Sequence, residues 1–280
     1  MHKVLVTVLG FGMVGAAWGQ AAPVKRMYVF GDSYSDTGRG FVDGNGPTAV
    51  AYLAKRLGLE MVASNAPDAS GKSLNFAVSG APTGSSAGRA LPGGGWLGLG
   101  MKEEVQEFVG MVKSGKAKFD PATTLFFIAG GLNDGRFPTA ETVANLEDEI
   151  LTLYGVGARR FAVAILPEKI PGFDKTSIRL NPALAGIPAE MRPKLAEATI
   201  ETSHWGAFFD EVMEHPAKYG IADTTHPCAA GRAIFNQDAT PCANPADHFY
   251  YNPAHPSTAT HKAVGDMLYD EVVATERVKQ

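Results

Sequence analysis

Residues 124–129 (TLFFIA) form a continuous apolar run, which is typical of a strand that is buried on both faces of a sheet. A second run of this kind covers residues 161–166, and shorter strand candidates cover 27–31 and 74–78. Between the runs, apolar residues recur at helical spacing over 48–57, 102–113 and 139–154. Strands that alternate with helices in this way predict an α/β protein with a parallel sheet that is covered on both faces.

The C-terminal third of the chain continues this pattern less regularly. Residues 189–214 are predicted to be helical, and residues 221–223 are predicted to form a short edge strand. Ser257 is a suitable N-cap for a last helix. The apolar stripe of that helix consists of Val264, Met267, Leu268 and Val272.

Acidic and basic residues are mixed along the chain, which has 25 Lys and Arg, 29 Asp and Glu, and a net charge of −4. The sequence shows no basic stripe, which argues against a nucleic-acid partner, and no acidic tail, which argues against a chaperone or activator. With 280 residues, of which 45% are hydrophobic, the chain is long enough to bury a sizeable core. The composition therefore favours a soluble globular protein.

The first 22 residues have the pattern of a secretory signal peptide. His2 and Lys3 give a positive start, residues 4–18 are apolar, and small residues occur at 19–22. A membrane anchor is the alternative, but the apolar run is short and broken by glycine, so we favour cleavage near residues 19–22. We expect a secreted protein, either periplasmic or extracellular, in which no later segment crosses a membrane.

The two cysteines, Cys228 and Cys242, are expected to form a disulfide in an exported protein. A metal site with the nearby His226 and His248 is the alternative, which we favour less because the spacing fits no familiar zinc pattern. The disulfide would close a loop just upstream of His255. It either restricts that loop or simply stabilises it.

Polar residues suited to nucleophilic chemistry follow the predicted strands. Ser33 follows the first strand, Gly80 the second and Asn133 the strand TLFFIA, and in parallel sheets functional residues collect beyond the carboxyl ends of the strands. A serine nucleophile needs a base, usually a histidine that a third group orients. The oxyanion that forms needs donors such as backbone N–H groups or an asparagine amide.

Four stretches supply these parts in chain order: GDSYSDTG at 31–38, NFAVSGA at 75–81, GGLND at 130–134 and NPAHPS at 252–257. Together they closely resemble the GDSL esterase/lipase family, also called SGNH hydrolases, over residues 27–272. The resemblance implies a single three-layer α/β/α domain over residues 23–280 with a flavodoxin-like, mainly parallel sheet. It also implies serine-dependent hydrolysis of carboxylic esters without a cofactor, and no metal site is expected.

The resemblance assigns a role to each of four residues. Ser33 matches the nucleophile and, through its own N–H, one oxyanion donor; Gly80 matches the second donor and the Asn133 amide the third. His255 matches the general base. Among the competing histidines, His261 is expected on the surface of the last helix, while His226 and His248 lie in the preceding loop. Asp32 and Asp36 are expected to brace the turn around Ser33 or the N-terminus of the next helix.

Asn252 departs from the family pattern, which carries Asp three residues before the catalytic histidine. An amide oxygen orients an imidazole, but it brings no negative charge to the imidazolium. Three explanations compete: Asn252 or a backbone carbonyl orients His255, another carboxylate such as Asp247 reaches the ring, or the protein has lost much of its hydrolase activity. We favour the first, with slower catalysis, because Ser33, Gly80 and Asn133 are intact.

The segments 91–100 (LPGGGWLGLG) and 167–190 are long enough to border the site, but neither indicates an acyl-chain length. The leading hypothesis is a secreted serine esterase for small or medium carboxylic esters, on an acylated carbohydrate, a lipid or another small molecule. The alternatives are an acyltransferase or lysophospholipase-like activity at the same site, and a non-catalytic secreted binding protein. The sequence does not indicate an oligomeric state.

Overall fold

A parallel sheet of six strands forms the middle of the molecule, in the order β2-β3-β1-β6-β7-β8. The computed structural model describes residues 22–92 and 94–277. The strands are β1 (Arg26–Gly31), β2 (Met61–Ala63), β3 (Ser73–Asn75), β6 (Thr124–Ala129), β7 (Arg160–Ala164) and β8 (Thr199–Ser203). The parallel sheet predicted from the apolar runs is therefore confirmed.

The central strands are buried along almost their whole length, as their continuous apolar sequences predict. In β6 every residue is buried, and in β1 only Arg26 is partly exposed. The two strands lie side by side in register, with Tyr28 opposite Phe126 and Phe30 opposite Ile128. The carboxyl end of β1, where Ser33 follows, thus lies at the centre of the sheet.

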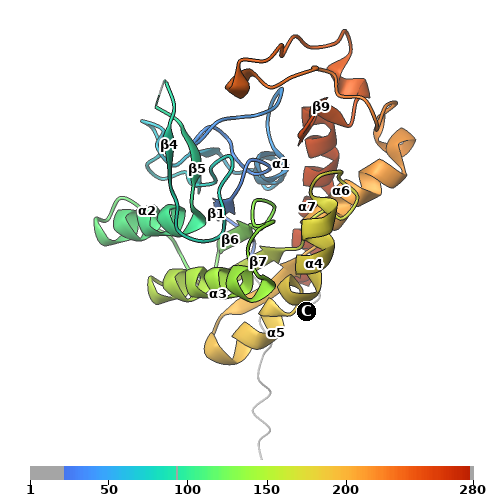
Figure 1. The fold of residues 1–280 in the computed structure, drawn as a ribbon. Helices are drawn as coiled ribbons and strands as arrows, with labels where there is room; N and C mark the ends of the chain where they lie inside the picture. The colour runs from blue at the N-terminus through green and yellow to red at the C-terminus, as the bar shows by residue number, and fades with distance from the viewer. Residues whose placement is uncertain (1–21, 93, 278–280) are drawn as a thin grey trace, which may run out of the picture.

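Helices cover both faces of this sheet (Figure 1). On one face α2 (Met101–Lys113) packs against α3 (Thr139–Gly155), and on the other α7 (Thr258–Arg277) packs against α1 (Ala49–Arg56) and α6 (Trp205–Glu214). Shorter helices, α4 (Asp174–Leu184) and α5 (Ile187–Met191), contact α3. The expected three-layer α/β/α fold is confirmed.

Two predictions for the C-terminal half are changed by the structure. Residues 189–214 are not one helix, because β8 separates α5 from α6 and pairs with β7. In TIETS only Ile200 is apolar, so neither an apolar run nor an alternation distinguishes this short strand from the neighbouring helical sequences. Residues 221–223 make only an isolated bridge, between Asp223 and His248.

Two small antiparallel ribbons lie outside the central sheet. The glycine-rich segment 91–100 forms the turn and the second strand of a hairpin of β4 (Ala87–Ala90) and β5 (Trp96–Leu99). A second ribbon, of β9 (Tyr250–Asn252) and β10 (His255–Pro256), directly precedes α7. Ser257 caps that helix by accepting the Thr260 N–H at 3.2 Å, as predicted.

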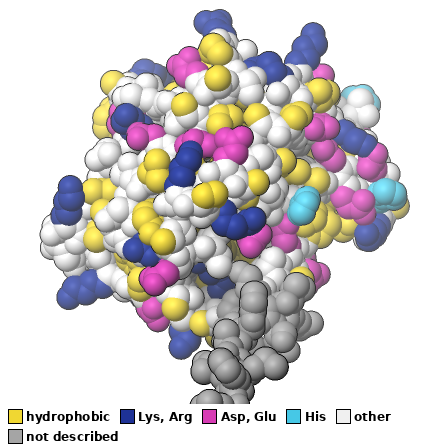
Figure 2. Space-filling view, turned by 90° about the horizontal axis from the view of Figure 1, so that it is seen from below, with side chains coloured by type: hydrophobic (Ala, Val, Ile, Leu, Met, Phe, Trp, Pro, Cys, Tyr) yellow, Lys and Arg dark blue, Asp and Glu magenta, His cyan; other side chains and the backbone are white. Residues whose placement is uncertain are grey.

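The predicted signal peptide falls almost wholly on residues 1–21, which lie outside the described residues. Within residues 22–92 and 94–277, no helix is long and apolar enough to cross a membrane. Figure 2 shows that, on the face seen from below, acidic, basic and hydrophobic side chains are interspersed.

Candidate active site

The candidate nucleophile, Ser33, lies in a tight turn at the end of β1. Gly31 allows the backbone to pass close to β6, because a Cβ at this position would lie 2.4 Å from the carbonyl oxygen of Ala129. The carbonyl of Asp32 then accepts the N–H groups of Ser35 and Asp36, at 2.9 and 3.0 Å. The backbone therefore turns sharply at Ser33 and leaves that side chain partly exposed.

His255 reaches this serine from a segment more than 200 residues further along the chain. Its Nε2 lies 2.8 Å from Ser33 Oγ. The Tyr34 hydroxyl donates to the Ala254 carbonyl at 2.9 Å, and the Tyr34 ring lies 5.5 Å from the imidazole. The residue that follows the candidate nucleophile thus holds the segment that presents the histidine.

The side chain of His255 is 95% buried. Burial lowers the pKa of His255 to about 4; the negative charge of Asp43 opposes this effect, and the positive charge of Arg232 adds to it. The ring is consequently neutral at neutral pH. A neutral ring with Nε2 facing a hydroxyl is the form that accepts a proton.

Two acceptors face the other ring nitrogen, Nδ1 of His255. Asn252 Oδ1 lies 3.3 Å away, and Asp43 Oδ2 lies 3.4 Å away. Asn252 Oδ1 also accepts the N–H groups of Ala254 and His255, while its Nδ2 donates to Asp43 Oδ1 at 2.8 Å. With two acceptors at Nδ1, the proton of the neutral ring belongs on Nδ1 and the lone pair on Nε2.

Asp43 is the site residue that sequence reasoning missed. It lies in the loop segment FVDGNGP between β1 and α1, where Asp-Gly is an ordinary turn signal, so no spacing links it to His255. Asp247, the carboxylate that we had considered, is exposed, and its backbone carbonyl accepts the N–H groups of Ala222 and Asp223. The carboxylate beside the ring is that of Asp43.

Arg232 holds Asp43 from the opposite side. Its Nε donates to Asp43 Oδ2 at 2.7 Å, and its Nη2 donates to the same oxygen. Arg232 belongs to the loop that the Cys228–Cys242 disulfide closes, and the presence of this bond agrees with the sequence prediction. Backbone bonds from Cys228 and Ala229 attach the loop to Tyr250 and Tyr251, in β9.

The other two candidate oxyanion donors, Gly80 and Asn133, follow β3 and β6, the strands on either side of β1. Asn133 Nδ2 donates to the Ala81 carbonyl at 3.0 Å, which brings its amide next to Gly80. Gly80 has a φ of +79°, a conformation that favours glycine. Asn133 is exposed, so its second amide hydrogen is accessible to a ligand.

Asp36 ties the Gly80 loop to the Ser33 loop. Its carboxylate accepts four backbone N–H groups, from Gly38, Gly40, Phe41 and Ser79. The side chain is fully buried, and this desolvation raises its pKa, although the four hydrogen bonds act in the opposite direction. Asp36 therefore braces the turn.

A second buried carboxylate, Glu104 of α2, joins the same strand ends. It accepts the N–H of Gly31 at 2.9 Å and that of Val78 at 3.0 Å. Desolvation raises the pKa of Glu104 well above its usual value. Asp134, next to Asn133, likewise accepts the N–H and hydroxyl of Thr83.

His261 is not on the helix surface, as we expected, but buried in the layer between α7 and α1. Its Nδ1 accepts the Ala49 N–H at 3.2 Å, and its ring contacts those of Tyr34 and Phe209. Its position on α7 faces the sheet because it lies one turn before Val264. The prediction of a surface position for His261 was wrong because histidine is polar, although its place in the helix is on the buried side.

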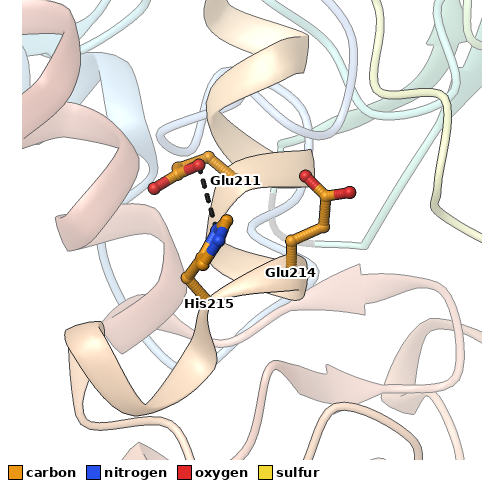
Figure 3. A group of neighbouring side chains, drawn as sticks. All are labelled: Glu211, Glu214 and His215. Atoms are coloured by element: carbon orange, nitrogen blue, oxygen red, sulfur yellow. Dashed lines mark ion pairs between the residues drawn. The ribbon is translucent and has the colours of Figure 1, made fainter.

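One group of potential metal ligands occurs within the described residues, at the C-terminal end of α6. Ligand atoms of Glu211, Glu214 and His215 lie within 4.8 Å of one another, and Figure 3 shows Glu211 facing His215. Both carboxylates already have cationic partners, because Lys218 pairs with Glu211 and Lys169 pairs with Glu214. These ion pairs account for the cluster without a metal.

The fold is a three-layer α/β/α sandwich in which a serine and a histidine are in contact beyond the end of β1. Residues 27–268 match the model of the GDSL-like lipase/acylhydrolase family. The chain therefore belongs to this family, whose members are carboxylic ester hydrolases.

The individual relatives have low sequence identity to this chain. The chain is 26% identical to the acetylesterase of Thermothelomyces thermophilus, over 88% of this chain and 87% of that protein. It is also 26% identical to the thermolabile hemolysin of Vibrio parahaemolyticus over 90% of this chain, but it spans only 64% of the length of that protein. A crystal structure of a catalytic mutant of Axe2, an acetylxylan esterase from Geobacillus stearothermophilus, has a similar fold. Its TM-score is 0.51 at 16% identity, with 90% of this chain and 96% of that chain covered.

Proposed function

We propose that the protein is a secreted serine esterase in which Ser33 is the nucleophile and His255 the general base. The observation that carries this proposal is the 2.8 Å contact between Ser33 Oγ and His255 Nε2, with the ring held neutral by burial. The N–H groups of Ser33 and Gly80 and the amide of Asn133 form the oxyanion hole. Asn252 orients the ring of His255.

Catalysis follows from these positions. His255 Nε2 takes the proton from Ser33 Oγ as the oxygen attacks the ester carbonyl, and the three donors stabilise the oxyanion. The protonated ring then gives its proton to the leaving alcohol, so that an acyl group remains on Ser33. Water attacks this acyl group with the same base, releases the acid and restores the serine.

A short acyl group on a polar alcohol is the proposed substrate class. A cavity of about 510 Å³ lies between residues 38–41, the β4–β5 hairpin and residues 233–236, and Asn65, Arg89 and Asn236 supply polar side chains to it. Ser33 and His255 do not line this cavity, but it adjoins the loop that Asp36 braces, so it would take the alcohol part of the ester rather than the reacting carbonyl. The similarity to an acetylesterase agrees with an acetyl ester.

Export is part of the same proposal. The N-terminal sequence predicts a signal peptide, and the Cys228–Cys242 disulfide suits an oxidising compartment.

Two measurements test the activity. A fluorophosphonate probe is expected to label the wild-type protein and not the Ser33→Ala variant. A panel of p-nitrophenyl esters from acetate to palmitate is expected to show a fall in rate beyond butyrate, with Ser33→Ala as the inactive control. A folded wild-type protein that neither reacts with the probe nor hydrolyses any ester would instead be a binding protein, and turnover that rises toward palmitate would indicate a lipase.

A further inference from the structure

The carboxylate of Asp43 lies on the side of the His255 ring that faces away from Ser33. Its Oδ2 is 3.4 Å from Nδ1, and both side chains are about 95% buried. It comes from the loop between β1 and α1, more than 200 residues before the histidine in the chain. At the position where the family pattern has a carboxylate, this chain has the neutral Asn252.

We propose that Asp43 is the positioning carboxylate of His255 and supplies the negative charge that Asn252 lacks. This inference rests on the proposed function. On this proposal, His255 still has a carboxylate beside Nδ1. The carboxylate comes from a different loop than in the family pattern, and it acts together with the amide of Asn252.

Asn252 and Asp43 act as a pair because the amide is held in one orientation. Its Nδ2 donates to Oδ1 and to the carbonyl of Asp43, at 2.8 and 3.2 Å, so its Oδ1 points toward the imidazole. That oxygen also accepts two backbone N–H groups, so a hydrogen bond from Nδ1 of His255 to it is weakened by this competition. Asp43 Oδ2 provides the second acceptor. When His255 takes the proton of Ser33, the positive ring has the carboxylate of Asp43 beside Nδ1.

Arg232 fixes the carboxylate and moderates its charge. The guanidinium donates two N–H groups to the oxygen of Asp43 that faces the ring. Its positive charge therefore opposes the effect of Asp43 on the imidazolium. The Cys228–Cys242 loop carries this arginine, so the disulfide acts on the base through Arg232.

The groups that face the His255 ring have opposing effects on its pKa. Asp43 raises it and Arg232 lowers it, while burial lowers it most. The Tyr34 ring lies 5.5 Å from the imidazole, and His261 lies on the α7 side, where burial keeps it neutral with a pKa of about 3. Neutralising Asp43 should therefore lower the pKa of His255, and neutralising Arg232 should raise it.

The test measures kcat, KM and the acid limb of the pH–rate profile with p-nitrophenyl acetate. Asp43→Asn is expected to reduce kcat about a hundredfold, less than the roughly 10⁴-fold loss in a serine protease because Asn252 still orients the ring. KM should be unchanged, and the acid limb should move to lower pH. Arg232→Gln should move the limb to higher pH, a reversal that a purely structural role would not produce. Asp247→Asn, which removes an exposed carboxylate nearby, should match the wild type.

An exchange of the two side chains provides the decisive variant. Asp43→Asn combined with Asn252→Asp restores a charge beside Nδ1 and should recover kcat to within about tenfold of the wild type. Wild-type kcat and an unmoved acid limb in Asp43→Asn, while Ser33→Ala is inactive, would overturn this inference and leave the esterase proposal intact. Activity that persists in Ser33→Ala would instead overturn the esterase proposal. If Asp43→Asn does not fold, the exchange variant and Arg232→Gln decide: a folded exchange variant without activity, or an unmoved limb in Arg232→Gln, contradicts the inference.

Discussion

The two halves of the candidate site are built in different ways. On the oxyanion side, buried carboxylates bind backbone N–H groups of the strand-end loops, as Asp36 and Glu104 do. On the base side, side chains bind one another: Asp43 comes from a loop near the N-terminus, and Arg232, Asn252 and His255 come from two segments near the C-terminus.

This difference shows which half tolerates change. Backbone N–H groups cannot be substituted, so a buried carboxylate that accepts several of them has no simple replacement. A carboxylate that acts on the His255 side chain can be replaced, because any segment of the chain that reaches the imidazole can carry the negative charge. The Asn252 amide with the Asp43 carboxylate is such an alternative. The following predictions test the comparison.

The largest effect is expected on the oxyanion side. Asp36→Ala leaves four backbone N–H groups without their acceptor, of which those of Gly40 and Ser79 make buried hydrogen bonds. The free energy of unfolding should fall by about 3–5 kcal/mol, since each of these two unmatched buried groups costs about 1–3 kcal/mol. Urea denaturation measures the loss. Asp36→Asn, which retains one acceptor oxygen, should lose less; a loss below about 1 kcal/mol in Asp36→Ala would mean that the loops do not depend on this carboxylate.

Removal of the disulfide should affect both stability and the base side. The Cys228→Ser, Cys242→Ser double variant should lose about 3 kcal/mol of unfolding free energy, because the open loop has more conformational freedom when unfolded. Since this loop carries Arg232, the acid limb of the pH–rate profile should also move toward higher pH, as in Arg232→Gln. Thermal melting and ester turnover separate the two effects, and a fall in melting temperature with an unchanged profile would leave the disulfide a purely stabilising role.

A smaller effect is expected from Asp32, next to Ser33. Burial raises its pKa from 3.8 to about 7, so between these values the folded protein binds more protons than the unfolded chain. Stability should therefore fall as the pH rises through this window, by about 2 kcal/mol between pH 5 and pH 7. Asp32→Asn, which cannot ionise, should remove this part of the fall. Urea denaturation of both proteins at pH 5 and pH 7 measures how the free energy of unfolding changes with pH. An equal change in the wild type and in Asp32→Asn would show that Asp32 is ionised in the folded state.

The smallest effect is expected from Asn252→Asp alone. Asn252→Asp puts a second carboxylate within hydrogen-bond distance of Asp43, so the pair should share one proton and carry the same net charge beside Nδ1 as the wild type. We therefore expect kcat to change by less than about threefold. A rise of roughly a hundredfold or more would show that the site lacked this charge, which contradicts the role of Asp43.

The sequence alone was sufficient for the four inner strands of the sheet, β3, β1, β6 and β7. Strands with continuous apolar runs, such as β1 and β6, form as predicted because burial on both faces requires apolar residues throughout. The edge strand β8 escaped prediction because it is short and only Ile200 in it is apolar.

What the sequence determined by itself is therefore local: which segments are strands, and which polar residues follow them at one edge of the sheet. Only the tertiary structure decided that Asp43 meets both His255 and Arg232, and that His261 is buried. The physical reason is that these contacts join side chains across long stretches of chain, where no periodicity or spacing relates the partners. The charge that appeared to be missing at Asn252 is provided by a loop more than 200 residues away in the chain.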